Sequence, residues 1–190
     1  PIKVVFYGFP KSGKSCYIND LIKGEFEDTY IQTENLVEQD YQVNLDGVPC
    51  DVTIFDITGE QLISTAATVA DYSKNGTIHI FLVNKNNSES FKFINGYVNR
   101  GINPDAIIDL LVFIVTHTDE DGDETVISNT KELATKKQGL YFELNLKDID
   151  SVKKSFEDII REYYSKKGIK PTAPISEPTE KGKSGCCVLL

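Results

Sequence analysis

The residue types with the clearest chemistry lie near the start of the chain, where residues 8–15 read G-F-P-K-S-G-K-S. They fit the pattern G-x-x-x-x-G-K-[ST], follow an apolar run at residues 3–7, and open a helical stretch. A loop of this kind turns successive backbone N–H groups toward one anion, and the helix behind it adds its positive end. The pattern therefore predicts a site for the phosphates of a nucleoside triphosphate, with an ordinary turn as the alternative.

Individual residues of this loop have distinct expected roles. Lys14 is placed to reach the outer phosphates, and the Ser15 hydroxyl is placed to hold Mg²⁺. The residues that we expect to line the phosphate site are Gly8, Lys11, Ser12, Gly13, Lys14, Ser15 and Cys16.

A second phosphate element follows the apolar run at residues 52–55, where Asp56 is followed three residues later by Gly59. An Asp at the carboxyl end of a strand beside the glycine loop can hold the Mg²⁺ shell through water. Gly59 would let its backbone N–H approach the terminal phosphate, where a side chain would block access. Taken alone, this D-x-x-G pattern also fits an ordinary turn.

The segment 26–33 between these motifs carries hydroxyl groups. One threonine there is needed to coordinate Mg²⁺ and to donate its N–H to the γ-phosphate, which orders the loop only while that phosphate is present. Thr29 and Thr33 are the two candidates.

From Lys3 to about Tyr164 the chain resembles a Ras-superfamily small GTPase, closest in loop lengths to the Ras and Rap branch. The resemblance implies GTP and GDP as ligands, with Mg²⁺. The family's switch threonine lies 18 residues past the serine of the glycine loop, which selects Thr33 over Thr29. The resemblance also implies that Phe26 packs edge-on against the guanine, with plain core packing as the alternative.

The family selects its base with N-K-x-D or T-K-x-D, and this chain has T-H-T-D at residues 116–119, after the apolar run 110–115. The Asp119 carboxylate accepts two hydrogen bonds, and guanine offers N1–H and its exocyclic amino group side by side, a pair that adenine lacks. Thr116 is a family variant that ties this loop to the glycine loop.

His117 replaces a lysine that covers one face of the base. It is either a stacking imidazole or a surface turn residue, and we expect weaker nucleotide binding and faster exchange.

The last family element, S-A-K, stands here as Asn145, Leu146 and Lys147. It lies 29 residues past Thr116, the usual interval of the Ras branch. The resemblance implies that the backbone N–H of Leu146 reaches the guanine O6, and Lys147 alone keeps the family residue.

For hydrolysis, the family places a Gln just after the D-x-x-G glycine, whereas this chain has Glu60 there, followed by Gln61. A carboxylate cannot donate a hydrogen bond to the transferred phosphate unless protonated, although it can take a proton from water. The alternative is that Glu60 has no role in hydrolysis and is simply an acidic residue at the start of a helix, where the helix dipole favours it. Arg100 and Arg161 both lie outside the switch loops, so acceleration requires a partner. The residues predicted to act in catalysis are Glu60, Lys14, Gly59 and Thr33.

The elements that position these residues follow from apolar runs that alternate with helical patterns. This alternation is typical of a parallel sheet with helices on both faces. We expect an α/β fold, the G domain of P-loop nucleoside triphosphatases, with a six-stranded, mostly parallel sheet. Asp46-Gly47 marks a hairpin turn, and Ser151 is the expected N-cap of the last helix. The strands are predicted near residues 3–8, 39–46, 50–56, 77–84, 109–116 and 140–145, and the helices near 14–23, 62–73, 88–100, 125–137 and 150–166.

Composition and charge indicate the cellular environment of the protein and the kind of partner it binds. The 190 residues suit one globular domain, and Cys16 and Cys50 are expected to be buried thiols in a reducing, cytosolic environment. Residues 166–190 hold five lysines against two glutamates, a net charge of +3, which leaves −12 to the rest of a chain whose total is −9. An acidic body argues against a nucleic acid partner.

The end of the chain carries a separate signal. Prolines among polar residues beyond Gly168 predict a G domain over residues 1–166 and a disordered tail over 167–190. The tail ends in C-V-L-L, a C-a-a-X pattern that predicts geranylgeranylation of Cys187, with Cys186 as a palmitoylation candidate. Lipid and basic residues together predict a location on the cytoplasmic face of a membrane, plasma membrane or endomembrane.

We therefore expect a monomeric, lipid-anchored GTP/GDP switch in signalling. Its partners would be an effector, an exchange factor and a GTPase-activating protein, all bound through the switch loops. The alternative is a nucleotide-dependent binding module with little or no turnover, which the unusual residues Glu60, His117 and Leu146 favour.

Overall fold

The structure, a computed structural model, describes residues 1–26, 37–57, 77–100, 102 and 107–172. The predicted strands and four of the five predicted helices are present, with ends within two residues of the prediction. The fifth predicted helix, at residues 62–73, lies outside the described residues. The strands are β1 (Ile2–Gly8), β2 (Val37–Leu45), β3 (Val48–Asp56), β4 (Ile78–Asn84), β5 (Leu110–Thr116) and β6 (Leu140–Glu143). The helices are α1 (Lys14–Lys23), α4 (Ser88–Arg100), α5 (Glu124–Lys136) and α6 (Ile149–Lys167).

The strands form one sheet in the order β2-β3-β1-β4-β5-β6. β1 pairs in parallel with β3 and β4, and β5 pairs in parallel with β4 and β6, whereas β2 and β3 are antiparallel. This confirms the predicted α/β fold with a mostly parallel sheet. Because β1, β3 and β5 run in the same direction, their carboxyl ends meet at one edge of the sheet, and the predicted site motifs follow these three ends.

The turn between β2 and β3 is built as predicted. Asp46 and Gly47 have φ angles of 53° and 86°, and positive φ at both central residues is what a two-residue hairpin of type I′ requires. The side chain of Asn44 accepts a hydrogen bond from the Gly47 N–H at 2.7 Å. On α6, Arg161 donates to both carboxylate oxygens of Asp46, so the hairpin is fastened to that helix.

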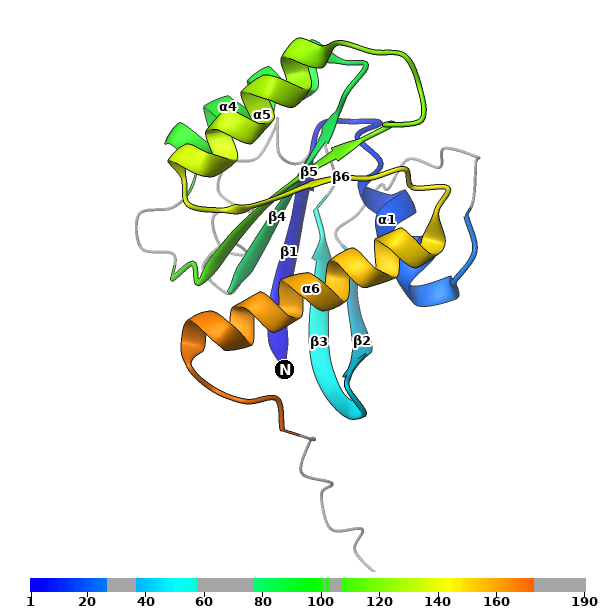
Figure 1. Cartoon of the computed structure of the whole chain (residues 1–190), viewed down its shortest axis with the longest axis vertical. Helices are drawn as coiled ribbons and strands as arrows, with labels where there is room; N and C mark the ends of the chain where they lie inside the picture. Colours follow the sequence, from blue (N-terminus) through cyan, green and yellow to red (C-terminus); the bar gives the residue numbers. More distant parts are fainter. Residues whose placement is uncertain (27–36, 58–76, 101, 103–106, 173–190) are drawn as a thin grey trace, which may run out of the picture.

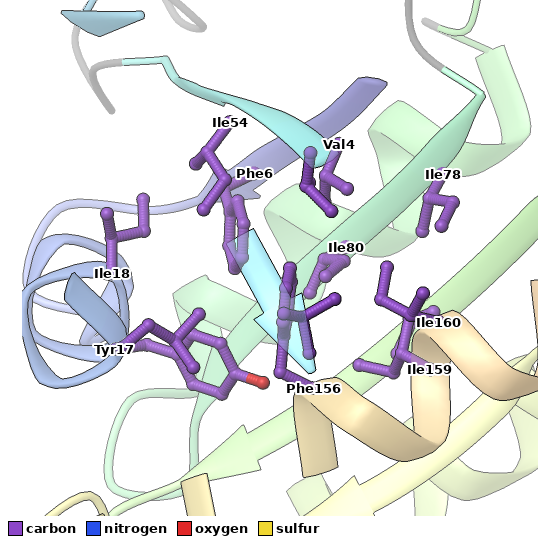
Figure 2. Close-up of a cluster of buried hydrophobic side chains, with 14 of the residues drawn as sticks. Val4, Phe6, Tyr17, Ile18, Ile54, Ile78, Ile80, Phe156, Ile159 and Ile160 are labelled. Carbon is purple, nitrogen blue, oxygen red and sulfur yellow. The ribbon is translucent and has the colours of Figure 1, made fainter. Parts of the chain in front are cut away.

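Helices cover both faces of the sheet (Figure 1). α1 and α6 cover one face, where Phe6, Tyr17 and Phe156 lie at the centre of a cluster of buried side chains (Figure 2). The hydroxyl groups of Tyr17 and Ser155 lie 2.8 Å apart and join the two helices. α4 and α5 cover the other face over a second cluster, in which Tyr7 stacks on Phe81 with ring centroids 4.9 Å apart. Each helix therefore buries one apolar stripe against the sheet.

The two cysteines in the described part of the chain differ in burial. Cys50 is buried in β3, as predicted, but the prediction for Cys16 is wrong, because this residue is only half-buried. Its Sγ lies 3.8 Å from Asp20 Oδ2, one turn further along α1, at the margin of the first cluster rather than inside it. Among the described residues, the helices are too short or too polar to span a bilayer.

The start of α6 corrects a second expectation. The N-cap is Asp148, not Ser151, which lies in the first turn. Asp148 accepts a hydrogen bond from the Ser151 N–H at 3.2 Å and a second from its hydroxyl at 2.6 Å. The carboxylate, three residues earlier, satisfies the exposed N–H groups at the helix start.

This cap predicts unequal effects for two substitutions. Asp148→Ala should lower the free energy of unfolding by about 1 kcal/mol, because the first turn of α6 loses its acceptor. Ser151→Ala keeps the backbone N–H and should cost less. Urea denaturation of both variants measures the difference, and a larger loss for Ser151→Ala would contradict the assignment of the cap.

Candidate functional site

The loop after β1 folds tightly onto the start of α1. A Cβ atom added to Gly8 would lie 2.1 Å from Ser12 Oγ, and Gly13, the N-cap of α1, has a φ of +87°. The Ser12 N–H donates to the Phe9 carbonyl at 3.0 Å, and Lys11 has a positive φ of 62°. The loop therefore presents backbone rather than bulky side chains at the positive end of a helix, which is how proteins bind phosphate.

Two side chains from other strands hold this loop by its carbonyl oxygens. Thr116, at the end of β5, donates from Oγ1 to the Ser12 carbonyl at 2.9 Å. Asn84, at the end of β4, donates from Nδ2 to the Lys11 carbonyl at 3.0 Å. Because a trans peptide directs its N–H opposite to its C=O, fixing the Ser12 carbonyl also fixes the direction of the Gly13 N–H.

Asn84 was missed by the sequence analysis, because a single asparagine after a strand resembles any loop residue. Asn84→Ala should speed nucleotide dissociation about fivefold to tenfold, because the Lys11 peptide loses its donor. Dissociation of a fluorescent nucleotide measures this effect, with thermal unfolding measured alongside. Asn99→Ala is the matched control, because Asn99 donates a similar bond to the Asn95 carbonyl at 2.8 Å on α4. Equal dissociation rates for the two variants would contradict the proposed role of Asn84.

The end of β3 brings a carboxylate against the first turn of α1. Ser15 Oγ donates to Asp56 Oδ2 at 3.0 Å, and Lys14 Nζ lies 3.6 Å from Asp56 Oδ1. Lys14 is 7% exposed and Asp56 is 5% exposed. Burial lowers the pKa of Lys14 and raises the pKa of Asp56, because both charged forms lose hydration. Among the described residues, no group donates a hydrogen bond to Asp56 Oδ1.

These residues fit a triphosphate with Mg²⁺. The Lys14 ammonium and the N–H groups at the start of α1 suit phosphate oxygens, while Ser15 and Asp56 offer the oxygen ligands that Mg²⁺ prefers. The part of the chain that the structure describes holds no group of three or more His, Cys, Asp or Glu residues that could hold a metal. Phosphate oxygens and water would therefore complete the coordination of Mg²⁺, which when bound neutralises charge on the phosphates.

One further carboxylate lies on α1, behind the glycine loop. Asp20 is fully buried, and burial raises its pKa to about 6. Only a thiol, that of Cys16, donates to it among the described residues, and its Oδ1 has no partner there. The folded state therefore binds this proton more tightly than the unfolded chain, whose Asp pKa is about 3.9.

Asp20→Asn should consequently raise the free energy of unfolding at pH 7 by about 2 kcal/mol. The cost of ionised Asp20 is present above pH 6 and disappears as the pH falls toward 4, so the difference from the unaltered chain should shrink over that range. Urea denaturation at pH 7 and pH 5 measures it. Asp158→Asn, an exposed position on α6, serves as control. A difference that stays constant with pH would contradict the prediction.

The predicted base loop follows β5. Asp119 Oδ2 accepts a hydrogen bond from Lys147 Nζ at 2.7 Å, and this bond holds the pKa of Asp119 below its usual range. This bond joins the loops after β5 and β6. Within the loop after β6, the Lys147 N–H donates to Asn145 Oδ1 at 2.9 Å. An ionised Asp119 at this position can accept two hydrogen bonds from adjacent donors on a base.

His117 adopts a left-handed backbone conformation with a φ of 62°. Its Nδ1 lies 2.8 Å from Thr116 Oγ1, whose single proton is already donated to the Ser12 carbonyl at 2.9 Å. With the threonine proton on that carbonyl, the tautomer of His117 that carries its hydrogen on Nδ1 completes this contact. The imidazole, the threonine hydroxyl and the glycine loop form one chain of hydrogen bonds. His117 is half-buried and contacts the threonine that holds the glycine loop, and its stacking on a base stays a prediction.

The side chain of Leu146 points inward. It is 7% exposed, and its Cδ1 would lie 2.5 Å from a Cβ atom added to Gly13. Leu146 occupies the space that a side chain at position 13 would need. Leu146 is itself a member of the first core cluster. Both residues were predicted site residues, but their contact depends on the fold and is not indicated by the sequence.

The remaining predicted residues divide into two groups. Phe26 is half-buried and packs against the first core cluster, which agrees with the core alternative and leaves its contact with a base a prediction. Cys16 follows Ser15 in the first turn of α1. Thr29, Thr33, Gly59, Glu60, Cys186 and Cys187 lie outside the described residues, and their roles stay predictions.

The fold and the site together define a P-loop nucleoside triphosphatase, in which a glycine loop closes over Lys14, Ser15 and Asp56 at the edge of a mostly parallel sheet. The loop that carries Asp119 lies beside it, joined through Thr116 to the glycine loop, and recognition of a base by Asp119 stays a prediction.

The model of the Ras family matches residues 3–165, and the chain belongs to that family. It is therefore a small GTPase that binds guanine nucleotides and works as a switch with the regulators and effectors typical of the family. The match is to the family as a whole, so the closer relation to the Ras and Rap branch stays a prediction.

Proposed function

We propose that this protein is a lipid-anchored signalling switch that binds GTP or GDP with Mg²⁺ at the cytoplasmic face of a membrane. The observation that supports nucleotide binding most strongly is the buried Lys14, Ser15 and Asp56 cluster, with Ser15 Oγ 3.0 Å from Asp56 Oδ2 beneath the glycine loop. The analysis of nucleotide that copurifies with the protein tests it directly. GDP or GTP is expected by mass, and equal affinity for ATP in calorimetry would overturn the proposal.

In this proposal the nucleotide controls two loops. The γ-phosphate would order the segments around Thr33 and Gly59, and an effector would recognise the ordered surface. An exchange factor and a GTPase-activating protein would act on the same loops of the monomer. Hydrolysis would release the effector.

Hydrolysis is proposed to be slow without a partner. Glu60 cannot donate a hydrogen bond to the transferred phosphate while ionised, and the carboxylate adds negative charge near it. Neither Arg100 nor Arg161 lies in a switch segment, and Arg161 is engaged with Asp46 at the hairpin. A partner would therefore supply the cation that stabilises the transferred phosphate.

The second candidate function is a nucleotide-dependent binding module with little or no turnover. The departures at Glu60, His117 and Leu146 favour it. Single-turnover hydrolysis of bound GTP, with and without Glu60→Gln, separates the two functions. Measurable turnover in the unaltered chain supports the switch. If the unaltered chain shows none and Glu60→Gln gains it, the binding module is supported.

The anchor is proposed from the last four residues alone. Geranylgeranyl transfer to Cys187 should add one lipid by mass and should disappear in Cys187→Ser, while Cys186 would carry a palmitoyl group. Absence of the lipid from Cys187 in the presence of an active transferase would overturn this part of the proposal.

A further inference from the structure

Residues 9–12 of the glycine loop form a tight turn. The Ser12 N–H donates to the Phe9 carbonyl at 3.0 Å, which closes the turn. Pro10 is the second residue of the turn, and Lys11, the third, has a φ of 62°. A proline followed by a residue of positive φ is typical of a type II turn. Pro10 also restricts the backbone of Phe9 before it, so the turn moves as one stiff piece.

The ring of Phe9 joins this turn to helix α4. The ring centroids of Phe9 and Phe93 lie 5.8 Å apart, with 55° between the ring planes. Tilted rings at this separation attract each other beyond the burial of their area. Both side chains are half-buried, and among the described residues this is the one ring pair that includes Phe9. Removing either ring would therefore remove the aromatic contact between the turn and α4.

Phe93 is itself held by the rings behind it. It stacks on Tyr97, one turn further along α4, with centroids 6.5 Å apart and 18° between the planes. Tyr97 in turn lies against Tyr7, with centroids 5.2 Å apart. Tyr7 is fully buried in β1, next to the Gly8 at which the glycine loop begins. Phe93 therefore presents a supported surface to Phe9.

A second contact from the same part of the chain holds the turn. The Asn84 side chain donates to the Lys11 carbonyl at 3.0 Å. The Asn84 N–H donates to Ser90 Oγ at 3.0 Å, and Ser90 is buried in the first turn of α4. Asn84 and Phe93 are thus parts of one unit formed by the end of β4 and by α4. This unit holds the turn by its first and its third residue.

We propose that Phe93 is a positioning residue for nucleotide binding, which acts through Phe9 to hold the turn at residues 9–12 in place. The turn directly precedes Gly13 and Lys14, where the loop offers its N–H groups and an ammonium group to the phosphates. Release of a ligand from such a loop requires the loop to open, so a contact that holds the loop lengthens the lifetime of the complex. The sequence motifs do not indicate Phe93, because its role depends on where α4 packs.

Plain packing in the second core cluster would give Phe93 a different signature. Phe91, two residues earlier on α4, is also half-buried and packs against that cluster. Within the described part of the chain, Phe91 makes no ring contact with the glycine loop. Loss of either ring should lower the thermal stability, whereas only the loss of Phe93 should change the release of nucleotide.

The release of a fluorescent GDP analogue from the full-length protein with Mg²⁺ tests the proposal. Phe93→Ala should speed release about fivefold to tenfold, within the range that one aromatic pair contributes. Phe91→Ala is the matched control, which should lower the midpoint of thermal unfolding similarly and leave release unchanged. Phe93→Tyr keeps a ring and should release the nucleotide at the unaltered rate. Unchanged release from Phe93→Ala, or equal acceleration by Phe91→Ala, would overturn the role of Phe93.

The other ring provides a test that leaves α4 unaltered. Phe9→Ala removes the same contact from the side of the loop, and it should also speed release about fivefold to tenfold. The chain that carries both Phe9→Ala and Phe93→Ala should release nucleotide no faster than the faster single variant, because the two changes remove one shared contact. Effects that multiply would show that the two rings act separately, and they would overturn the proposal.

The proposal rests on nucleotide binding, and the measurements separate the two. An unaltered chain that retains no guanine nucleotide would overturn both, whereas normal retention with no effect of Phe93→Ala or Phe9→Ala would overturn only the role of Phe93. Competition of GTP against ATP supplies a further readout. The affinities for both should fall by the same factor in Phe93→Ala, because the turn acts on the phosphates and not on the base. A changed preference between the two bases would contradict the proposal.

Discussion

Asp119→Asn should lower the affinity for GTP by about 100-fold or more and should raise the affinity for xanthosine triphosphate. The ionised carboxylate offers acceptors to both N1–H and the exocyclic amino group of guanine. An amide offers one acceptor and one donor, so its donor would face the amino group of guanine. Xanthine has a carbonyl oxygen in place of that amino group, and it matches the amide.

The test is sharp because the substitution should leave the fold intact. Asp119 is paired with Lys147, whose side chain is 55% exposed, and losing an exposed ion pair costs at most about 1 kcal/mol. Competition of GTP, xanthosine triphosphate and ATP against a fluorescent nucleotide measures the exchange of specificity. Asp121→Asn, an exposed position in the same loop, is the control and should bind GTP normally. Unchanged GTP affinity in Asp119→Asn would remove Asp119 from base recognition.

The fold was predictable because its elements follow local rules. The run 110–115 is apolar throughout and becomes β5, a largely buried interior strand between β4 and β6. Helical patterns in the sequence predicted α1 and α4 with the same first and last residues that the structure has. The start of α6 was misplaced because Asp148 and Ser151 are both good capping residues three positions apart, and periodicity alone does not choose between them.

The site was predictable only where its residues share a motif. Lys14 and Ser15 are neighbours in one loop, and their roles follow from spacing. Asn84 and Lys11 are 73 positions apart, and their contact depends on β4 lying next to β1 in the sheet. Strand order is a property of the whole fold, so no local pattern around Asn84 indicates what its amide reaches.

The contact between the glycine loop and Leu146 has the same origin and leads to the second large effect. Gly13→Ala should lower the free energy of unfolding by about 3 kcal/mol and weaken GTP binding at least about 100-fold. An alanine at a φ of +87° is strained, and its Cβ would lie 2.5 Å from Leu146 Cδ1. Either Leu146 leaves the core or the loop shifts, and a shifted loop misdirects the Gly13 N–H.

Two variants separate the causes. Gly168→Ala also requires a positive φ, of 64°, but its Cβ would meet nothing within 4 Å, so it should cost only about 1 kcal/mol and leave GTP binding unchanged. Adding Leu146→Ala to Gly13→Ala removes the clash but not the strain, so part of the GTP affinity should return even though the core loses a buried side chain. Urea denaturation and nucleotide competition measure both quantities. If Gly13→Ala proves no more harmful than Gly168→Ala, the side chain of Leu146 yields freely, and the loops after β1 and β6 are not locked together.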